Sequence, residues 1–342
     1  MIIIMENIEN QNITENLKQA KKQFSKIGLM AFVGSLIIMG LQLGTAGIVK
    51  LIDESILDNM NVYFALNMLP MYLIGMPILI FLLTRVKGKK IEKHKMNVGH
   101  WFLAFFMCYA LLYVSNLIGQ FITTIIGLLK GNMIGNPILE ATTGVNPWLS
   151  AFFIVICAPI LEEIIFRKVL IERAVKYGEG VAVFLSAFMF GMYHGNVNQL
   201  VYAFVLGLMF GFIYVKTGKL IYTIILHMVI NFMGSVAGMF VLNLLDMEAY
   251  EQMMTMTDPA EMTAALLKIM PGLMALMGYL AVILCIVITG LILLVVMRKK
   301  FVCRQGEVVI PKGKRFSTMM LNVGMILFII LWTIMIIYQL FA

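Results

Sequence analysis

Long apolar runs separated by short polar segments dominate the chain. About 20 apolar residues are needed to cross ~30 Å of hydrocarbon, and nine runs approach or exceed that length. The pattern therefore predicts an all-α fold, a polytopic transmembrane helix bundle of about 8–9 spans. The expected spans are residues 27–50, 62–84, 101–129, 148–169, 180–194, 198–215, 220–244, 271–297 and 317–341.

The fifth run, 180–194, is too short to cross the membrane alone. We therefore expect the turn that follows it to lie submerged and enclosed by other helices, because exposed backbone is not tolerated in hydrocarbon. Two further local features follow from residue type. Pro159 removes a backbone hydrogen bond and predicts a kink in the fourth span, and Gly207 with Gly211 predicts close helix packing in the sixth.

Basic residues cluster after alternate runs and so predict orientation. Lysines and arginines follow the second, fourth, sixth and eighth runs, whereas the loop 245–270 carries five acidic residues against Lys268. The positive-inside rule then predicts a multi-pass protein of the cell membrane with a cytoplasmic N-terminus and an external C-terminus. The net charge of +8 follows from these loops, so the expected partner is the lipid bilayer and no nucleic acid.

Composition supports the membrane assignment. The chain is 61% hydrophobic and only 13% charged, whereas soluble domains carry about 25% charged residues. Its four cysteines are scattered without a CxxC pair, which indicates neither a disulfide framework nor a zinc knuckle. Thirty methionines are most simply explained as flexible packing residues.

Four regions follow from this pattern. Residues 1–26 form a polar cytoplasmic segment, expected to be a short helix or tail at the membrane surface, and residues 27–147 hold the first three spans. Residues 148–244 form a candidate catalytic core, and residues 245–342 hold an acidic outer loop and the last spans. The core is singled out because ionisable side chains occur inside its spans.

Charged side chains near the bilayer centre cost about 2.5–3.5 kcal/mol each, so they usually face a bundle interior and mark function. Three clusters in the core qualify: the stretch CAPILEEIIFRKVL at 157–170, His194 at the end of the fifth run, and His227 with Asn231 in the seventh. A membrane-embedded cluster of this kind predicts a site built between helices.

Helical spacing makes the first cluster interpretable. Glu163 and Arg167 are four residues apart, so they lie on one helix face and can form an ion pair. Glu162 lies about 100° around the helix without a local partner. We therefore assign Glu162 to chemistry and Glu163 with Arg167 to support.

The remaining clusters supply imidazoles and an amide. His227 and Asn231 are also four residues apart and share one face of the seventh span. Glu162 with His194 and His227 can activate a water, either as bases or as ligands of a zinc ion. Asn231 can donate to a developing oxyanion. Activated water beside an oxyanion donor predicts hydrolysis of a carbonyl bond.

Together these motifs resemble the CPBP family of intramembrane proteases. EExxxR (Glu162, Glu163, Arg167), FxxxH (Phe190, His194) and HxxxN (His227, Asn231) occur in the order and at the separations of that family. The family includes the type 2 CAAX prenyl endopeptidases, the lysostaphin-resistance A-like proteins and the bacteriocin-immunity proteins once called Abi. The resemblance covers about residues 148–235.

The resemblance implies an endopeptidase that cuts a membrane-associated peptide or protein. Glu162 would activate water beside His194, and His227 and Asn231 would complete the site, with zinc as a possible cofactor held by Glu162, His194 and His227. Phe190 would be a supporting residue. Two alternatives stay open: a non-catalytic immunity or scaffold protein, and a proton-coupled transporter in which buried Glu and His form a relay.

Overall fold

The computed structural model describes residues 2–135 and 137–341, and within these ranges every regular element is helical. Eight segments are long and apolar enough to span a membrane, and a ninth, Glu179–Tyr193, is shorter. The predicted polytopic helix bundle is thus confirmed. The eight segments are Asn12–Ile52, Met60–Thr84, Val98–Lys130, Pro147–Tyr177, Val197–Thr217, Leu220–Leu242, Pro259–Lys300 and Val323–Phe341.

The first half of the bundle contains long helices and short irregular ones. In chain order these are α1 (Ile2–Ile52), η1 (Glu54–Asp58), α2 (Met60–Pro70), η2 (Met71–Gly75), α3 (Met76–Thr84), α4 (Val98–Lys130), α5 (Pro137–Thr142), α6 (Pro147–Ala151), η3 (Phe152–Cys157), α7 (Ala158–Glu162), η4 (Glu163–Ile171), α8 (Glu172–Ala174) and η5 (Val175–Tyr177).

The second half follows the same pattern. Its elements are α9 (Glu179–Tyr193), α10 (Val197–Thr217), α11 (Leu220–Asn231), η6 (Phe232–Ala237), α12 (Gly238–Leu242), α13 (Met247–Thr255), α14 (Pro259–Met297), η7 (Arg298–Lys300), η8 (Lys312–Lys314), α15 (Arg315–Met320) and α16 (Val323–Phe341). The helix pairs α9–α10, α10–α4, α4–α14 and α1–α16 make the main contacts.

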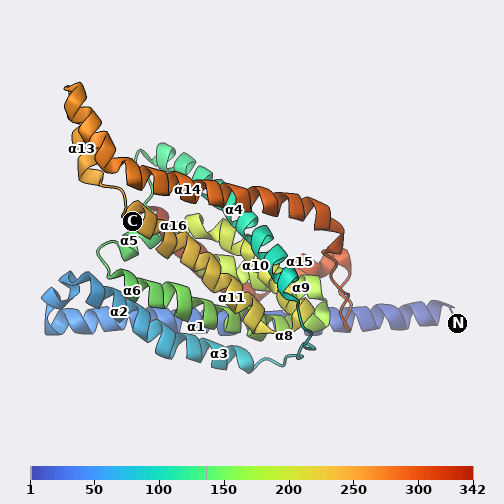
Figure 1. Ribbon diagram of the computed structural model, residues 1–342. Coiled ribbons are helices and arrows are strands. Elements are labelled where there is room, and N and C mark those ends of the chain that lie inside the picture. The colour runs from blue at the N-terminus through green and yellow to red at the C-terminus, as the bar shows by residue number, and fades with distance from the viewer. Residues whose placement is uncertain (1, 136, 342) are drawn as a thin grey trace.

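The two ends of the bundle differ in charge. In Figure 1, α1 starts at the end of the bundle opposite to α13 and to the last turn of α16. The basic loop 85–97 lies beside the segment 298–315, as the ion pair between Lys89 and Glu307 at 2.5 Å shows. The basic residues that follow alternate spans therefore gather at one end, hereafter the basic end, as the loop pattern requires.

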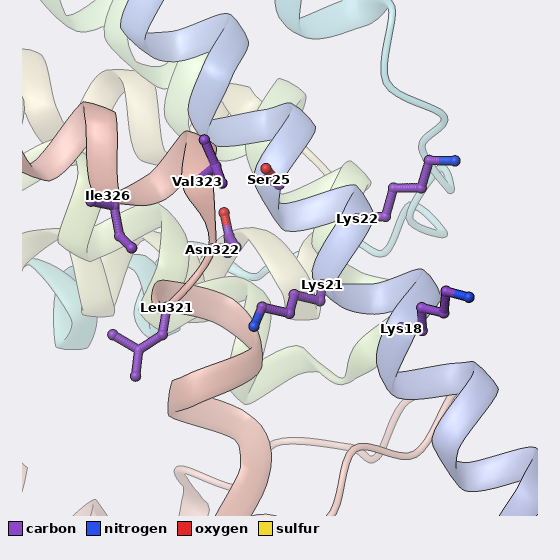
Figure 2. A pocket seen from close by; sticks show the side chains of 8 residues that line it. All are labelled: Lys18, Lys21, Lys22, Ser25, Leu321, Asn322, Val323 and Ile326. Atoms are coloured by element: carbon purple, nitrogen blue, oxygen red, sulfur yellow. The ribbon is translucent and has the colours of Figure 1, made fainter.

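The N-terminal segment differs from the expected separate surface element. It is continuous with the first span in α1, because no proline or glycine interrupts the sequence before Gly28. At Gly28 the helix meets α16 so closely that an added Cβ would lie 2.4 Å from the Gly324 carbonyl carbon. Beside this contact is a pocket of about 360 Å³ lined by three α1 lysines, Lys18, Lys21 and Lys22 (Figure 2).

The segment 245–270 contains α13 and the first turns of α14, where the sequence led us to expect a loop. The carboxylate of Asp246 accepts from the Ala249 N–H at 2.9 Å and starts α13, and Asp258 caps α14 in the same way at Ala260. Both are favoured helix-capping residues, and Pro259 suits the first helical position. The acidic residues that suggested a loop are thus the caps and first turns of two helices.

The last span begins later than predicted. A break at Leu321 and Asn322 separates α15 from α16, and the Asn322 side chain accepts from the Met325 N–H at 3.1 Å. The span therefore starts at Val323 rather than 317, because an asparagine favours a helix start over a helix interior.

Close packing of α9 on α10 positions the candidate site. An added Cβ on Gly207 would lie 2.8 Å from the Ala187 Cα, and one on Gly211 would lie 3.2 Å from Val183, so the predicted glycine contact is confirmed. The turn after α9 is enclosed as expected: Gly195 adopts φ +65° beneath Trp332 of α16, and Asn196 is buried. This leaves His194 inside the bundle.

Candidate active site

The fourth span changes helical register twice around Pro159. The segments η3 and η4 are π-helical, and the short α7 that contains Pro159 lies between them. In the π register the Ala158 N–H donates to the Phe153 carbonyl, five residues back. Such π segments occur often at functional sites, and here they replace the simple kink that Pro159 predicted.

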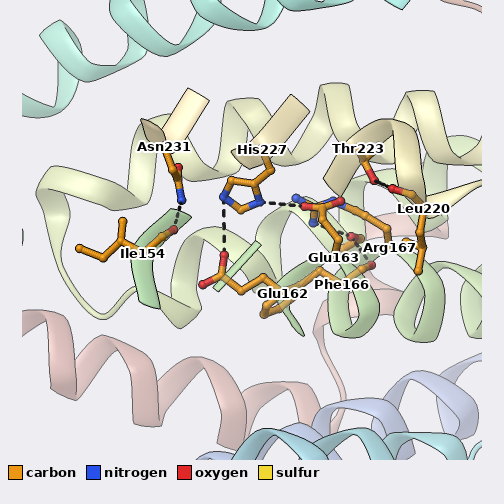
Figure 3. Close-up of polar contacts among 10 residues, drawn as sticks. Ile154, Glu162, Glu163, Phe166, Arg167, Leu220, Thr223, His227 and Asn231 are labelled. Carbon is orange, nitrogen blue, oxygen red and sulfur yellow. Dashed lines mark hydrogen bonds and ion pairs between the residues drawn. The ribbon is translucent and has the colours of Figure 1, made fainter. Parts of the chain in front are cut away.

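Asn231 compensates for the missing N–H of Pro159. If the π-helix continued, the carbonyl of Ile154 would accept from the N–H of residue 159. That residue is Pro159, which has no N–H to donate. The Asn231 side-chain amide donates to this carbonyl at 2.9 Å (Figure 3). One amide hydrogen of Asn231 therefore anchors α11 to η3, and its second hydrogen stays available.

Arg167 and Glu163 form a buried ion pair, as their spacing predicted. Their side chains are fully buried, and Arg167 Nε lies 3.3 Å from Glu163 Oε2. The guanidinium lies 4.4 Å from the ring centroid of Phe190 and 5.5 Å from that of Phe210, and it donates to the Ser186 hydroxyl at 3.3 Å. The cationic group is thus compensated by a carboxylate and two aromatic faces.

His227 lies between the two adjacent glutamates. Its Nδ1 is 3.2 Å from Glu163 Oε1, and its Nε2 is 3.7 Å from Glu162 Oε2 (Figure 3). Because the Glu163 carboxylate is ionised beside Arg167 it can only accept, so Nδ1 carries a proton. The imidazole therefore presents Nε2 to Glu162, whose side chain remains 13% exposed while that of Glu163 is fully buried.

His194 is held by its own helix. Its Nδ1 lies 2.8 Å from the Phe190 carbonyl oxygen, and because a carbonyl can only accept, Nδ1 carries the proton. The lone pair of Nε2 is left free to accept a proton. Both imidazoles pack against the Phe190 ring, with centroids 4.8 Å away for His194 and 6.0 Å away for His227.

The site contains residues that sequence reasoning missed. Tyr72, Tyr193 and Tyr202, from three different helices, all interact electrostatically with Glu162. The Tyr193 hydroxyl is buried and has no hydrogen-bond partner in the described ranges. Tyrosines in membrane helices usually mark the interface, so the sequence carried no signal for them. Phe210 and Ser186 were missed likewise, since aromatic and small residues abound in these spans.

The three candidate zinc ligands do not form a metal-binding cluster in this arrangement. Across residues 2–135 and 137–341, no group of three or more His, Cys, Asp or Glu side chains is gathered closely enough to hold a metal ion. His194 and His227 each use Nδ1 in a protein hydrogen bond, which leaves Nε2 of each ring as the nitrogen able to bind a metal.

The fold and the site define a multi-pass membrane protein in which Glu162 and Glu163 of the fourth span flank His227 of α11. Residues 144–233 match the family model described as type II CAAX prenyl endopeptidase Rce1-like. The match confirms the resemblance to CPBP-family intramembrane proteases over residues 144–233. No curated protein and no solved structure matches the chain.

Proposed function

We propose that this protein is an intramembrane endopeptidase that hydrolyses a peptide bond of a membrane-associated protein or peptide. The observation that carries the proposal is the placement of His227 between Glu162 and Glu163, with Glu163 neutralised by Arg167. That arrangement leaves one carboxylate, Glu162, free for proton chemistry inside the membrane region.

In the proposed mechanism Glu162 takes a proton from water as the water oxygen attacks the substrate carbonyl carbon. The lone pair of His194 Nε2 accepts a hydrogen bond from the same water and helps to position it. The carbonyl π electrons move to oxygen, and the second amide hydrogen of Asn231 stabilises this oxyanion. The Nε2 lone pair of His227 faces Glu162 and can accept from its carboxyl once that group carries the proton. Glu162 then delivers the proton to the leaving amine as the C–N bond breaks.

The surroundings of the site suit such chemistry. Phe190 and Phe210 cover Arg167 and His227 with apolar rings, which lowers the local dielectric and strengthens hydrogen bonds to a developing charge. Glu162 retains partial access through its 13% exposed side chain, so a water can reach it.

Cleavage of a membrane-tethered reporter peptide by purified protein in detergent tests the proposal. We expect Glu162→Gln and His194→Ala to lower kcat by about 100-fold or more, the usual contribution of a general base. The matched controls Glu251→Gln and His100→Ala replace exposed residues outside the site and should retain turnover. Wild-type turnover in both site variants would exclude the assignment, and would leave an immunity, scaffold or transport role to test.

A further inference from the structure

A second polar site lies at the basic end of the bundle. A cavity of about 500 Å³ opens between the loop 85–97, the end of η4 and the turn from α10 to α11. Four lysines line it: Lys90 and Lys93 from the loop, Lys168 from η4 and Lys219 from the turn. We call this cavity the basic pocket.

The positive charge of the basic pocket is not compensated by the protein. In the described part of the chain, no lysine of the four has an ion-pair or hydrogen-bond partner for its ammonium group, whereas nearby Lys89 and Lys216 are paired. Glu172 is the carboxylate in the lining, and it accepts from the Tyr214 hydroxyl at 3.1 Å. The lining therefore carries a net positive charge that an anion would neutralise.

The walls of the basic pocket are preformed. The loop is tied to the neighbouring helices by hydrogen bonds from the Lys89 N–H to the Glu172 carbonyl at 2.6 Å and from the His94 N–H to the Thr217 carbonyl at 2.8 Å. Gly218 adopts φ +60°, and an added Cβ there would lie 2.4 Å from the Glu92 carbonyl oxygen. A loop fixed in this way loses little entropy when an anion binds.

Aromatic residues beside the basic pocket indicate where the pocket lies along the membrane normal. Trp101 donates its indole N–H to the Tyr222 carbonyl at 3.1 Å, and the Tyr222 hydroxyl accepts from the Met96 N–H at 3.1 Å. Trp and Tyr gather where membrane helices meet the headgroup layer. Ile221, which also lines the pocket, is 53% exposed on the outer face of α11. The positive charge of the pocket thus lies next to an apolar surface, as the anionic headgroup of a lipid lies next to its acyl chains.

We propose that the basic pocket binds the phosphate group of an anionic lipid headgroup, with the acyl chain along the exposed side of α11. Basic pockets between membrane helices bind headgroups by this combination of charge and depth. The α1 pocket of Figure 2 does not match it, because Lys18 and Lys22 point away from Lys21 there and all three come from one helix. The inference is independent of the proposed peptidase activity.

Native mass spectrometry of the full chain, purified in non-ionic detergent with added phosphatidylglycerol or phosphatidylcholine, tests this site. We expect one phosphatidylglycerol to be retained in preference to phosphatidylcholine. The variant Lys90→Gln/Lys93→Gln should bind it about tenfold or more weakly, since each lysine near a lipid phosphate contributes about a factor of five. The variant Lys168→Gln/Lys219→Gln, from the opposite wall, should do the same.

Controls separate the site from general charge effects. Lys312→Gln/Lys314→Gln removes the same charge from an exposed segment outside the basic pocket and should bind like the wild type. Unchanged melting temperatures of all variants in phosphatidylcholine would show that the fold is intact. Equal phosphatidylglycerol binding by all variants, or equal retention of both lipids, would overturn the proposal. Binding of soluble glycerol 1-phosphate as tight as that of the lipid would overturn the lipid assignment.

Discussion

At the residue scale, the two adjacent glutamates have different surroundings because they project from different faces of the same helix. Glu163 faces Arg167 and is fully buried, while Glu162 points around the helix to His227 Nε2. The sequence predicted the ion pair from its i,i+4 spacing. It did not predict that Glu163 also accepts from His227, because contacts between different spans leave no periodic signal in one sequence.

The substitution Glu163→Gln tests this division of roles. It leaves the Arg167 charge buried and uncompensated, and breaking a buried pair in this way costs about 3–5 kcal/mol. We expect a lower melting temperature in detergent, together with reduced peptide cleavage because a neutral amide oxygen is a weaker acceptor for His227 Nδ1 than the carboxylate. Glu251→Gln is the exposed control, and a melting temperature of Glu163→Gln equal to that of the wild type would contradict the buried ion pair.

At the scale of elements, the fourth span and α11 depend on each other. Asn231 satisfies a carbonyl that Pro159 leaves without a donor. The sequence indicated a distortion at Pro159 and a polar stripe on the seventh span. It could not indicate the π register, because that register results from tertiary packing rather than from local residue preference.

A double-mutant cycle tests this dependence. Asn231→Ala removes the amide donor and should destabilise the protein by about 1–3 kcal/mol, the cost of an unpaired buried carbonyl. Pro159→Ala supplies a backbone N–H, so the same substitution should cost less in the Pro159→Ala background. Unfolding in denaturant gives the free energy of unfolding of the wild type, the two single variants and the double variant. Strictly additive changes in this free energy would show that Asn231 and Pro159 are not coupled through the carbonyl of Ile154.

The contact between α9 and α10 gives a second prediction at this scale. Gly207→Ala would place a Cβ 2.8 Å from the Ala187 Cα, so the helices must separate, at a cost of about 1–3 kcal/mol. We expect a lower melting temperature. Gly278→Ala in α14 is the matched control, because its Cβ would meet no atom within 4 Å and alanine favours a helix. Equal melting temperatures for the two variants would contradict the close contact.

At the scale of the whole molecule, the sequence predicted most of the architecture because lipid imposes simple rules on length and charge. Span positions, the enclosed turn after α9 and the gathering of basic loops at one end all follow from them. The helix α13, the early start of α14 and the continuous α1 were missed, since hydropathy locates the lipid boundary and not the helix end. The contacts of His227 were missed because they require three-dimensional packing.

The same charge rule predicts orientation, which a cysteine-labelling experiment measures. A variant that retains only Cys303, beside the basic segment 298–315, should react with a membrane-impermeant maleimide in opened cells and not in intact ones. A companion with Met254→Cys as its sole cysteine, on the exposed side of α13, should label in intact cells, because α13 lies at the opposite end of the bundle (Figure 1). The reverse pattern would place the basic end outside, against the positive-inside rule, and would move the basic pocket to the other leaflet.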